Sequence, residues 1–131
     1  MTDQPLSGQV VWVTGAGSGI GEAGAVALAE AGAVVYLSGR RAEPLEAVAG
    51  RIRDAGGQAL IALLDVADKA EVKRVADEIL AAQGRIDILI NSAGLNVPER
   101  AWNVVSPEGW DQVIRVDLDG AFYCTHAVLP A

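Results

Sequence analysis

The stretch that decides the fold is residues 10–21, VVWVTGAGSGIG, in which an apolar run ends in closely spaced glycines. The run from Val10 to Val13 is typical of a short strand that is buried on both faces within a parallel sheet. The glycines that follow let the main chain turn sharply and approach a ligand closely, because no Cβ stands in the way. From Ile20 onward the residues favour a helix. We therefore predict a strand, a tight loop and a helix, in that order.

The predicted helix would direct unpaired N–H groups and a partial positive charge at the glycine loop, which suits a pyrophosphate. Two glycine patterns overlap here. The pattern G-x-G-x-x-G of residues 19–24 begins well beyond the strand, whereas Thr14-Gly15-x-x-x-Gly19-x-Gly21 begins at the strand end. We favour the second as a dinucleotide-binding loop; the alternative is that the glycines, 15 in this chain, only form turns. No Gly-Lys-Ser/Thr follows, which disfavours a P-loop NTPase.

The composition describes a chain that can build a core and has no strongly basic segment. Its 131 residues suit a single domain over residues 1–131, and 51% of them are hydrophobic. The net charge of −7 argues against nucleic acid as a partner, and no apolar run approaches the length of a membrane span. The first residues, MTDQPLSGQ, have no basic region followed by an apolar segment, so we expect no secretory signal and a cytoplasmic protein.

Strand and helix patterns alternate along the rest of the chain. Short apolar runs rich in Val, Ile and Leu are followed by stripes of apolar residues at helical spacing. We predict further strands at 33–38, 59–64 and 86–90, and further helices at 42–55, 69–82 and from 107 to near 130. Parallel strands joined by right-handed crossover helices follow from this alternation. The predicted fold class is therefore α/β, with a doubly wound parallel sheet.

The residues after the second predicted strand bear on the choice of cofactor. About 20 residues beyond the glycine loop, an NAD site carries an Asp or Glu that binds the adenosine ribose. Here Ser38 and Gly39 hold that place, and Arg40 offers a forked, permanent positive charge that suits a 2′-phosphate. Arg41 is a candidate second cation. We therefore favour NADP(H) over NAD(H); the alternative is that both arginines are solvated residues at a helix start.

Two further strand ends carry candidate binding residues. Asp65-Val66 closes the third predicted strand, and Asn91-Ser92-Ala93-Gly94 follows the fourth. Together with the Thr14-Gly15-x-x-x-Gly19-x-Gly21 pattern and the Trp110-Asp111 helix, their order and spacing resemble the N-terminal half of the short-chain dehydrogenase/reductase family. Ser92 stands where the family has a second Asn, a conservative departure. The alternatives are that Asp65 is a helix cap or turn acid, and that Asn91 and Gly94 only form a turn.

The resemblance implies a Rossmann fold with strand order 3-2-1-4 that binds NAD(P)(H) at the strand ends. It places Asp65 at the adenine amino group and Val66 at a main-chain contact, while Asn91 braces its strand and Gly94 lets the cofactor pass. We assign thirteen residues to the cofactor, on the basis of the loop pattern, the charge of the arginines and the resemblance. They are Thr14, Gly15, Ser18, Gly19, Ile20, Gly21, Arg40, Arg41, Asp65, Val66, Asn91, Ala93 and Gly94.

Catalytic residues are only partly represented in this chain. In the family, catalysis uses an Asn in the last of these helices, then a Ser and a Tyr-x-x-x-Lys pair further along. Asp117 stands at the Asn position, which adds a negative charge and removes an amide donor. Neither Tyr36 nor Tyr123 has a Lys four positions later. We expect this chain to bind cofactor, and to support hydride transfer with an alcohol or carbonyl substrate once C-terminal residues complete it.

A non-catalytic dinucleotide-binding or scaffold module is the alternative function. A sheet that ends at its fourth strand has an open edge, and the apolar stripe of the last helix lacks cover, so we expect a homo-oligomer or a complementing chain. Cys124 is predicted to be a small buried residue and His126 to be structural or exposed. Trp102 and Trp110 are predicted to pack in the protein rather than to stack on a ligand. No metal site is expected.

Overall fold

The computed structural model describes residues 3–130. Four parallel strands form one sheet in the order β3-β2-β1-β4. They are β1 (Val10–Thr14), β2 (Val34–Gly39), β3 (Gln58–Leu63) and β4 (Ile88–Asn91). β1 pairs with β2 on one side and with β4 on the other, so that Thr14 lies between Ser38 and Asn91. This topology confirms the predicted Rossmann fold and its strand order.

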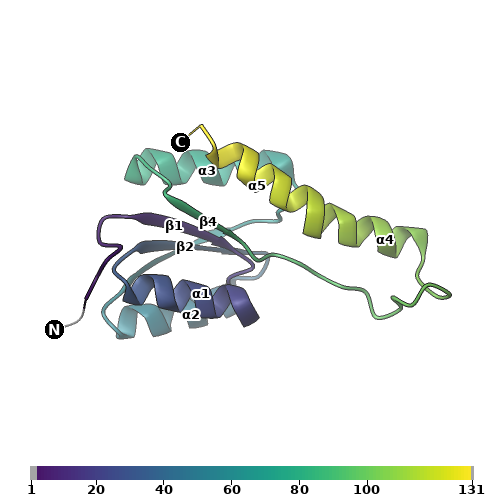
Figure 1. Cartoon of the computed structure of the whole chain (residues 1–131), viewed down its shortest axis with the longest axis horizontal. Coiled ribbons are helices and arrows are strands. Elements are labelled where there is room, and N and C mark those ends of the chain that lie inside the picture. Colours follow the sequence, from purple (N-terminus) through teal and green to yellow (C-terminus); the bar gives the residue numbers. More distant parts are fainter. Residues whose placement is uncertain (1–2, 131) are drawn as a thin grey trace.

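Helices cover both faces of the sheet (Figure 1). On one face lie α1 (Gly19–Glu30) and α2 (Ala42–Asp54), and on the other lie α3 (Lys69–Gln83) and α5 (Gly120–Val128). α5 is the end of a long helical segment that begins with α4 (Pro107–Val113) and continues through the π-helix η1 (Ile114–Asp119). α4 and the irregular segment before it extend beyond the sheet (Figure 1). Within residues 3–130, no helix combines the length and apolarity that a membrane crossing requires.

The core consists of two apolar layers, one on each face of the sheet. Successive residues of β1 point to opposite faces. Val11 and Val13 therefore pack with residues of α1 and α2, whereas Trp12 packs with residues of α3 and α5. The Trp12 indole donates a hydrogen bond to Ser38 Oγ (2.9 Å), which pairs a buried polar group and turns the Ser38 side chain inward. β1 is buried along its whole length, as predicted for a central strand.

The last helical segment differs from the single uninterrupted helix that the sequence predicts. The π-helix Ile114–Asp119 separates α4 from α5. A π-helical turn replaces the i→i+4 bonds by i→i+5 bonds and shifts the face that follows it. Gly120 directly after it packs closely on the loop beyond β3, because a Cβ at this position would lie 2.6 Å from Val66 Cγ2. The spacing of apolar residues does not reveal such a local insertion.

The fourth strand begins two residues later than predicted, at Ile88 rather than Ile86. The main-chain N–H of Val10 donates to the Asp87 carboxylate (2.8 Å), and the N–H of Asp87 donates to the Val10 carbonyl (2.8 Å). The Asp87 side chain therefore takes the place of a main-chain acceptor at the first step of the β1–β4 pairing. The regular ladder starts only after it.

The structure shows where the side chains of Cys124, His126 and two tryptophans lie. Cys124 is fully buried, as predicted, and burial raises the pKa of its thiol to about 12. His126 is exposed and stacks on Phe122, with ring centroids 5.6 Å apart. The prediction that Trp110 and Trp102 pack in the protein is wrong for both. The Trp110 side chain is 53% exposed, and the Trp102 side chain is 91% exposed because its segment lies beyond the sheet. Its one aromatic neighbour in the described part of the chain is Trp110, at 6.4 Å.

Candidate functional site

The predicted binding residues meet where the strands end. β1 ends at Thr14, β2 at Gly39 and β4 at Asn91, and these ends share one edge of the sheet because the strands are parallel. From β1 the chain continues to β2 and β3 on one side, and it returns to the other side of β1 as β4. The crossovers therefore diverge at the end of β1. Ligands of open α/β sheets bind at such a switch point.

Positive φ angles and close packing shape the glycine loop. Gly15 has a φ of +64°, and a Cβ on it would lie 2.5 Å from the Ser92 carbonyl oxygen. Gly19 has a φ of +58° but open space where a Cβ would stand. Glycine is thus required at position 15 both for the positive φ and for the close contact with Ser92. At position 19 it is required for the positive φ alone. Gly21 is buried against the main chain of Gly15, so the loop and α1 touch directly.

The first turn of α1 has N–H groups without acceptors. Its N-cap residue, Ser18, is extended and makes no side-chain capping bond, and the first main-chain bond of the turn runs from Glu22 N to the Ser18 carbonyl (3.2 Å). Asp68 and Ser106, by contrast, cap α3 and α4 through their side chains. Among residues 3–130, no acceptor lies on the N–H groups of residues 19–21. An anion can take that place.

Thr14 holds the glycine loop to the end of β4. Its buried hydroxyl donates to the Ile90 carbonyl (3.4 Å) and accepts from the N–H of Ala93 (3.3 Å). On the opposite side, Ala16 N donates to the Ser38 carbonyl (3.1 Å). The loop is therefore attached to both neighbouring strands.

A cavity of about 390 Å³ opens between the glycine loop and the start of α2. Gly15, Ser18, Arg40 and Arg41 are among the residues that line it. Both arginines are exposed, and within residues 3–130 neither forms an ion pair. Two unpaired cations beside an uncapped helix start favour phosphate groups in this cavity.

A second cavity of about 120 Å³ shares Gly15, Gly39 and Arg40 with the first. It extends past the end of β3 toward β4. Of the predicted cofactor residues, it is lined by Gly15, Arg40, Asp65, Val66, Ala93 and Gly94. The two cavities adjoin at these shared residues and together follow the strand ends, with the arginines at one end and the exit from β4 at the other. We call this the strand-end cleft.

Asp65 lines the strand-end cleft and also forms a turn. Its Oδ1 accepts from Ala67 N (3.0 Å), while its own N–H donates to Glu71 Oε2 (3.2 Å). The structure thus places it as a turn acid, which is one of the two interpretations of the sequence. Within residues 3–130, its second carboxylate oxygen makes no hydrogen bond, so this oxygen can accept one from a ligand.

Side chains from the last helical segment hold the exit from β4. Asn91 Nδ2 donates to Thr125 Oγ1 of α5 (3.1 Å), and the N–H of Leu95 donates to Asp117 Oδ1 of η1 (2.8 Å). The Asp117 carboxylate therefore binds the main chain just beyond Gly94. This is a positioning contact that an Asn side-chain oxygen could also make, so the departure from the family's Asn is compatible with the geometry.

Several residues of the strand-end cleft escape sequence reasoning. Pro44 and Leu45 of α2 line the larger cavity, and Leu95 and Val116 line the smaller one. They are apolar residues without a motif, and only the packing of α2 and η1 at the strand ends brings them there. Gly17, which also lines the larger cavity, lies within the glycine loop, so the loop pattern could have included it.

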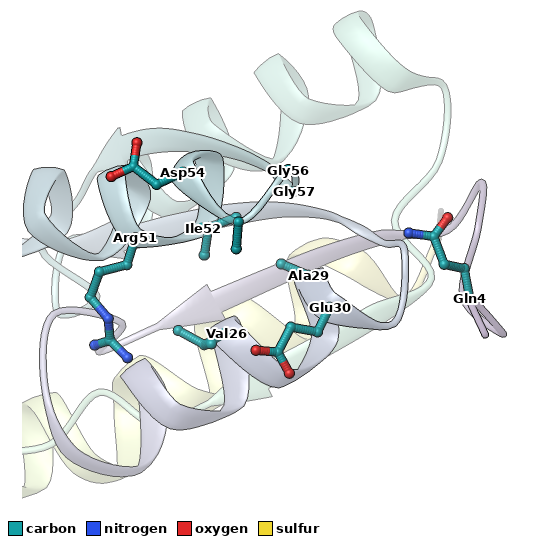
Figure 2. Close-up of a pocket in the computed structure, with 10 residues that line it drawn as sticks. Gln4, Val26, Ala29, Glu30, Arg51, Ile52, Asp54, Gly56 and Gly57 are labelled. Carbon is teal, nitrogen blue, oxygen red and sulfur yellow. The ribbon is translucent and has the colours of Figure 1, made fainter. Parts of the chain in front are cut away.

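A separate groove of about 660 Å³ lies between α1 and α2 (Figure 2). Glu30 and Asp54 bring negative charge to it, and its one arginine, Arg51, is already paired with Glu22. This charge distribution disfavours a phosphate. None of the predicted cofactor residues lines the groove, so it is not part of the candidate site.

Comparison with known proteins identifies the class to which this fold and cleft belong. The family model for short chain dehydrogenases matches residues 9–131. The chain therefore belongs to the short-chain dehydrogenase/reductase family of oxidoreductases. A curated relative is meso-2,3-butanediol dehydrogenase of Serratia marcescens, which is 35% identical over 122 residues. The match covers 93% of this chain and 47% of that protein.

Solved structures of the family superpose closely on the chain. Citronellol catabolism dehydrogenase of Pseudomonas aeruginosa PAO1 is 37% identical with a TM-score of 0.92, and the match covers 99% of this chain and 53% of that one. A metagenomic short-chain oxidoreductase in complex with NADP is 39% identical with a TM-score of 0.91, with coverage of 96% and 57%. The chain thus spans about half the length of these relatives.

Proposed function

We propose that this chain binds NADP(H) in the strand-end cleft. Residues 1–131 would then form the cofactor-binding domain of an oxidoreductase that acts on a small alcohol or carbonyl compound. The observation that carries this proposal is the uncapped start of α1 beside Arg40 and Arg41, at the switch point of the sheet. The absence of a Cβ at Gly15 supports it further, because the loop can then lie flat against the exit from β4. A relative of known structure also binds NADP.

Each part of the dinucleotide has a candidate partner in the cleft. The N–H groups of the first turn of α1 suit the pyrophosphate, and Arg40 suits the 2′-phosphate, with Arg41 as a second cation. The position that holds a carboxylate in an NAD site is occupied by Ser38, and the Ser38 side chain is turned inward to Trp12. The second oxygen of Asp65 suits the adenine amino group, and Gly94 leaves room at the exit from β4. When bound, the cofactor supplies or accepts a hydride.

The reaction also needs a group that donates or accepts a proton. Tyr36 is unsuited, because it is buried and its hydroxyl accepts a hydrogen bond from Gln83 Nε2 (3.1 Å) on the α3 face. Tyr123 is followed four positions later by Ala127 rather than by Lys. We propose that a Ser and a Tyr-x-x-x-Lys pair supplied by C-terminal residues provide the proton chemistry, while Asp117 positions the main chain beyond β4.

The proposal can be tested by replacing Arg40 with aspartate. Calorimetric titration of wild type should detect NADP⁺ binding that is tighter than NAD⁺ binding. Arg40→Asp should weaken NADP⁺ by about 10- to 100-fold, the cost of lost charged hydrogen bonds, and should change NAD⁺ binding far less. Lys73→Asp is the matched control, because it makes the same charge change on the exposed side of α3 and should leave both affinities nearly unchanged.

Two outcomes would contradict the proposal. No binding of either nucleotide to folded protein would refute the cofactor site itself. Equal losses for NADP⁺ and NAD⁺ in Arg40→Asp would refute its role at the 2′-phosphate. A non-catalytic dinucleotide-binding or scaffold module is the second candidate. It would be preferred if the chain joined to its C-terminal residues bound NADP(H) but oxidised no alcohol and reduced no carbonyl.

We further propose that the protein associates with a second copy or a complementing chain in the cytoplasm. Within residues 3–130, β4 lies at one end of the sheet and pairs only with β1. Beside it, the last helical segment exposes Leu118, Phe122 and Leu129. An open strand edge and an uncovered apolar face both favour association. The single cysteine is buried and thus suits a compartment in which disulfides do not form.

A further inference from the structure

The segment between β4 and α4 forms a small cavity that the proposed cofactor site does not use. Its volume is about 140 Å³. Two indoles and three aliphatic side chains make up its apolar lining: Val97, Trp102, Val105, Trp110 and Val113. Asn96 and Arg100 are its polar members. We call it the aromatic cavity.

Hydrogen bonds hold the walls of the aromatic cavity. The N–H of Val105 donates to the Ala101 carbonyl (2.9 Å), which folds the chain around the first indole. Ser106 Oγ accepts from Gly109 N (3.0 Å) and fixes the start of α4. Val97 then packs on α4, since its Cγ2 lies 3.5 Å from the Cβ position of Gly109. The cavity is therefore a built part of the fold.

The aromatic cavity directly adjoins the inner end of the strand-end cleft. Leu95 lines the cleft and Asn96, the next residue, lines the aromatic cavity. Along the last helical segment, Val116 lines the cleft and Val113, three residues earlier, lines the aromatic cavity. The two cavities are therefore neighbours both along the chain beyond β4 and along the last helical segment. A molecule held in the aromatic cavity is thus placed beside the end of the cleft that lies farthest from Arg41.

The size of the cavity suits one aromatic ring or an equally compact apolar group. A protein cavity of about 150 Å³ with an apolar lining admits benzene. The indoles of Trp102 and Trp110 are 91% and 53% exposed, so a ring packed against this pair would remove a large apolar surface from water. Exposed tryptophans of this kind are typical of binding surfaces.

Arg100 gives the aromatic cavity a preference for a negative charge. It is exposed, and within residues 3–130 it forms no ion pair, not even with its sequence neighbour Glu99. A guanidinium binds a carboxylate through paired hydrogen bonds. An unpaired guanidinium at the cavity distinguishes an anionic ligand from a neutral one.

We propose that the alcohol or carbonyl substrate carries a compact aromatic or apolar group together with a carboxylate, with the ring in the aromatic cavity and the carboxylate at Arg100. This inference rests on the proposed function, because it assigns the cavity to the substrate of the cofactor-dependent reaction. It names the class of the substrate and the residues that select it. Trp102 and Trp110 bind the ring, and Arg100 selects the charge.

Phenylacetate is a suitable probe, with phenylacetamide as its neutral counterpart and acetate as the carboxylate without a ring. With the 131-residue chain in the presence of NADP⁺, phenylacetate should quench tryptophan fluorescence in a saturable manner, and acetate should not. Arg100→Gln should weaken phenylacetate by about tenfold or more and leave phenylacetamide unchanged. Trp102→Ala should abolish the binding of both, measured by calorimetry because this variant lacks one of the two indoles that report binding.

Controls separate this inference from its rivals. Leu129→Ala removes another exposed apolar side chain, far along the last helical segment, and should leave phenylacetate binding unchanged. Equal phenylacetate affinity in wild type and Arg100→Gln, or in wild type and Trp102→Ala, would overturn the proposal. The proposal would also be overturned if wild type bound no phenylacetate and Trp102→Ala lowered the mass of an oligomer. The indoles would then contact a second copy of the chain.

The outcome also distinguishes this inference from the proposed function. Binding of NADP⁺ without phenylacetate or phenylacetamide would overturn the substrate assignment alone and leave the cofactor site intact. If the protein binds phenylacetate but binds neither NADP⁺ nor NAD⁺, the proposed function is overturned. The interpretation of the aromatic cavity as a substrate site is then overturned as well. Binding of both, with tighter phenylacetate binding when NADP⁺ is present, is the expected result.

Discussion

At the residue scale, a few single positions carry most of the geometry of the site. Gly15 permits both a left-handed conformation and contact with the exit from β4, and Thr14 joins the same two elements through its hydroxyl. Asp117 holds Leu95 from the opposite side. The site is therefore preorganised by interactions within the chain, and substitutions here should change its shape as well as its chemistry.

Gly15→Ala tests the close approach of the glycine loop to β4. Gly8 is a matched control, because it also has a positive φ (+85°) but nothing within 4 Å of its Cβ position. Gly8→Ala should lower the free energy of unfolding by about 1–2 kcal/mol, the cost of a left-handed alanine. Gly15→Ala should cost about 1–3 kcal/mol more, because the new methyl overlaps the Ser92 carbonyl. Urea unfolding measures both, and equal losses would contradict the close contact.

Asp87 should contribute to a dependence of stability on pH. The Arg85 guanidinium, and after it the N–H of Val10, hold the pKa of Asp87 below its ordinary value of 3.8. A carboxyl with a lowered pKa stabilises the folded state at pH values above about 4, and this contribution is lost as the pH falls through the folded-state pKa. Asp87→Asn should therefore lower the free energy of unfolding by about 1 kcal/mol at pH 7, with a smaller difference at pH 3.

Urea unfolding of both proteins at pH 7 and pH 3 checks this expectation. Asp77→Asn is the control, because Asp77 pairs with Lys73 on the exposed surface of α3. Exposed pairs of this kind contribute about 0.5 kcal/mol or less. A pH-independent difference for Asp87→Asn would show that the carboxylate charge is not what stabilises the start of β4.

At the scale of elements, the π-helix η1 determines how the last helical segment meets the sheet. It carries Asp117 to the exit from β4, and it is followed by Gly120, which lies against Val66 at the end of β3. The segment therefore contacts the loops beyond two different strands within one π-helical turn. α4, which precedes it, extends past the sheet (Figure 1). It also forms one wall of the aromatic cavity.

Gly120→Ala tests this docking against the helix preference of alanine. In an open helical position, replacing glycine by alanine stabilises by about 0.5–1 kcal/mol. Gly24 in α1 is such a position, since nothing lies within 4 Å of its Cβ position. Gly24→Ala should therefore raise the melting temperature. Gly120→Ala should lower the melting temperature. It should reduce the free energy of unfolding by about 1–3 kcal/mol, because the new methyl would lie 2.6 Å from Val66 Cγ2. Stabilisation by both substitutions would contradict the close docking.

At the scale of the whole molecule, the two edge strands of the described sheet differ in the helix surface that lies beside them. β3 lies at one end of the sheet and β4 at the other, and the helices α3 and α5 cover a single face between them. The outer side of the last helical segment exposes Leu118, Phe122 and Leu129 next to the free edge of β4. This combination of an unpaired edge and an apolar helix face is the part of the surface most suited to a partner.

Phe122→Glu should weaken association through this face. Wild type should sediment above the mass of a monomer at concentrations of tens of micromolar, and Phe122→Glu should shift it toward the monomer, because a charge cannot be buried there without a partner. Leu60→Glu places the same charge on a half-exposed leucine of β3, at the other end of the sheet, and should leave the distribution unchanged. A wild type that stays monomeric throughout would argue against this interface.

The fold itself could be predicted almost completely from local patterns in the sequence. Val10–Val13 predicts a buried central strand, and the alternation of apolar runs with helical stripes predicts the parallel sheet that the structure has. The order of the Gly15, Asp65 and Asn91 motifs predicts the family. These features depend on main-chain hydrogen bonding and on the spacing of buried residues, which are properties of short stretches of chain.

What the sequence by itself determined, then, is the order of the elements, the register of the glycine loop and the family of the protein. Only the tertiary structure decided that Asp117 binds Leu95, that a π-helix interrupts the last helix, and that Trp102 lies on the surface beside a cavity rather than in the core. The physical reason is that these features arise between residues far apart along the chain. The energies of these contacts depend on how the elements pack against one another. The pattern of residues within a single element does not contain that information.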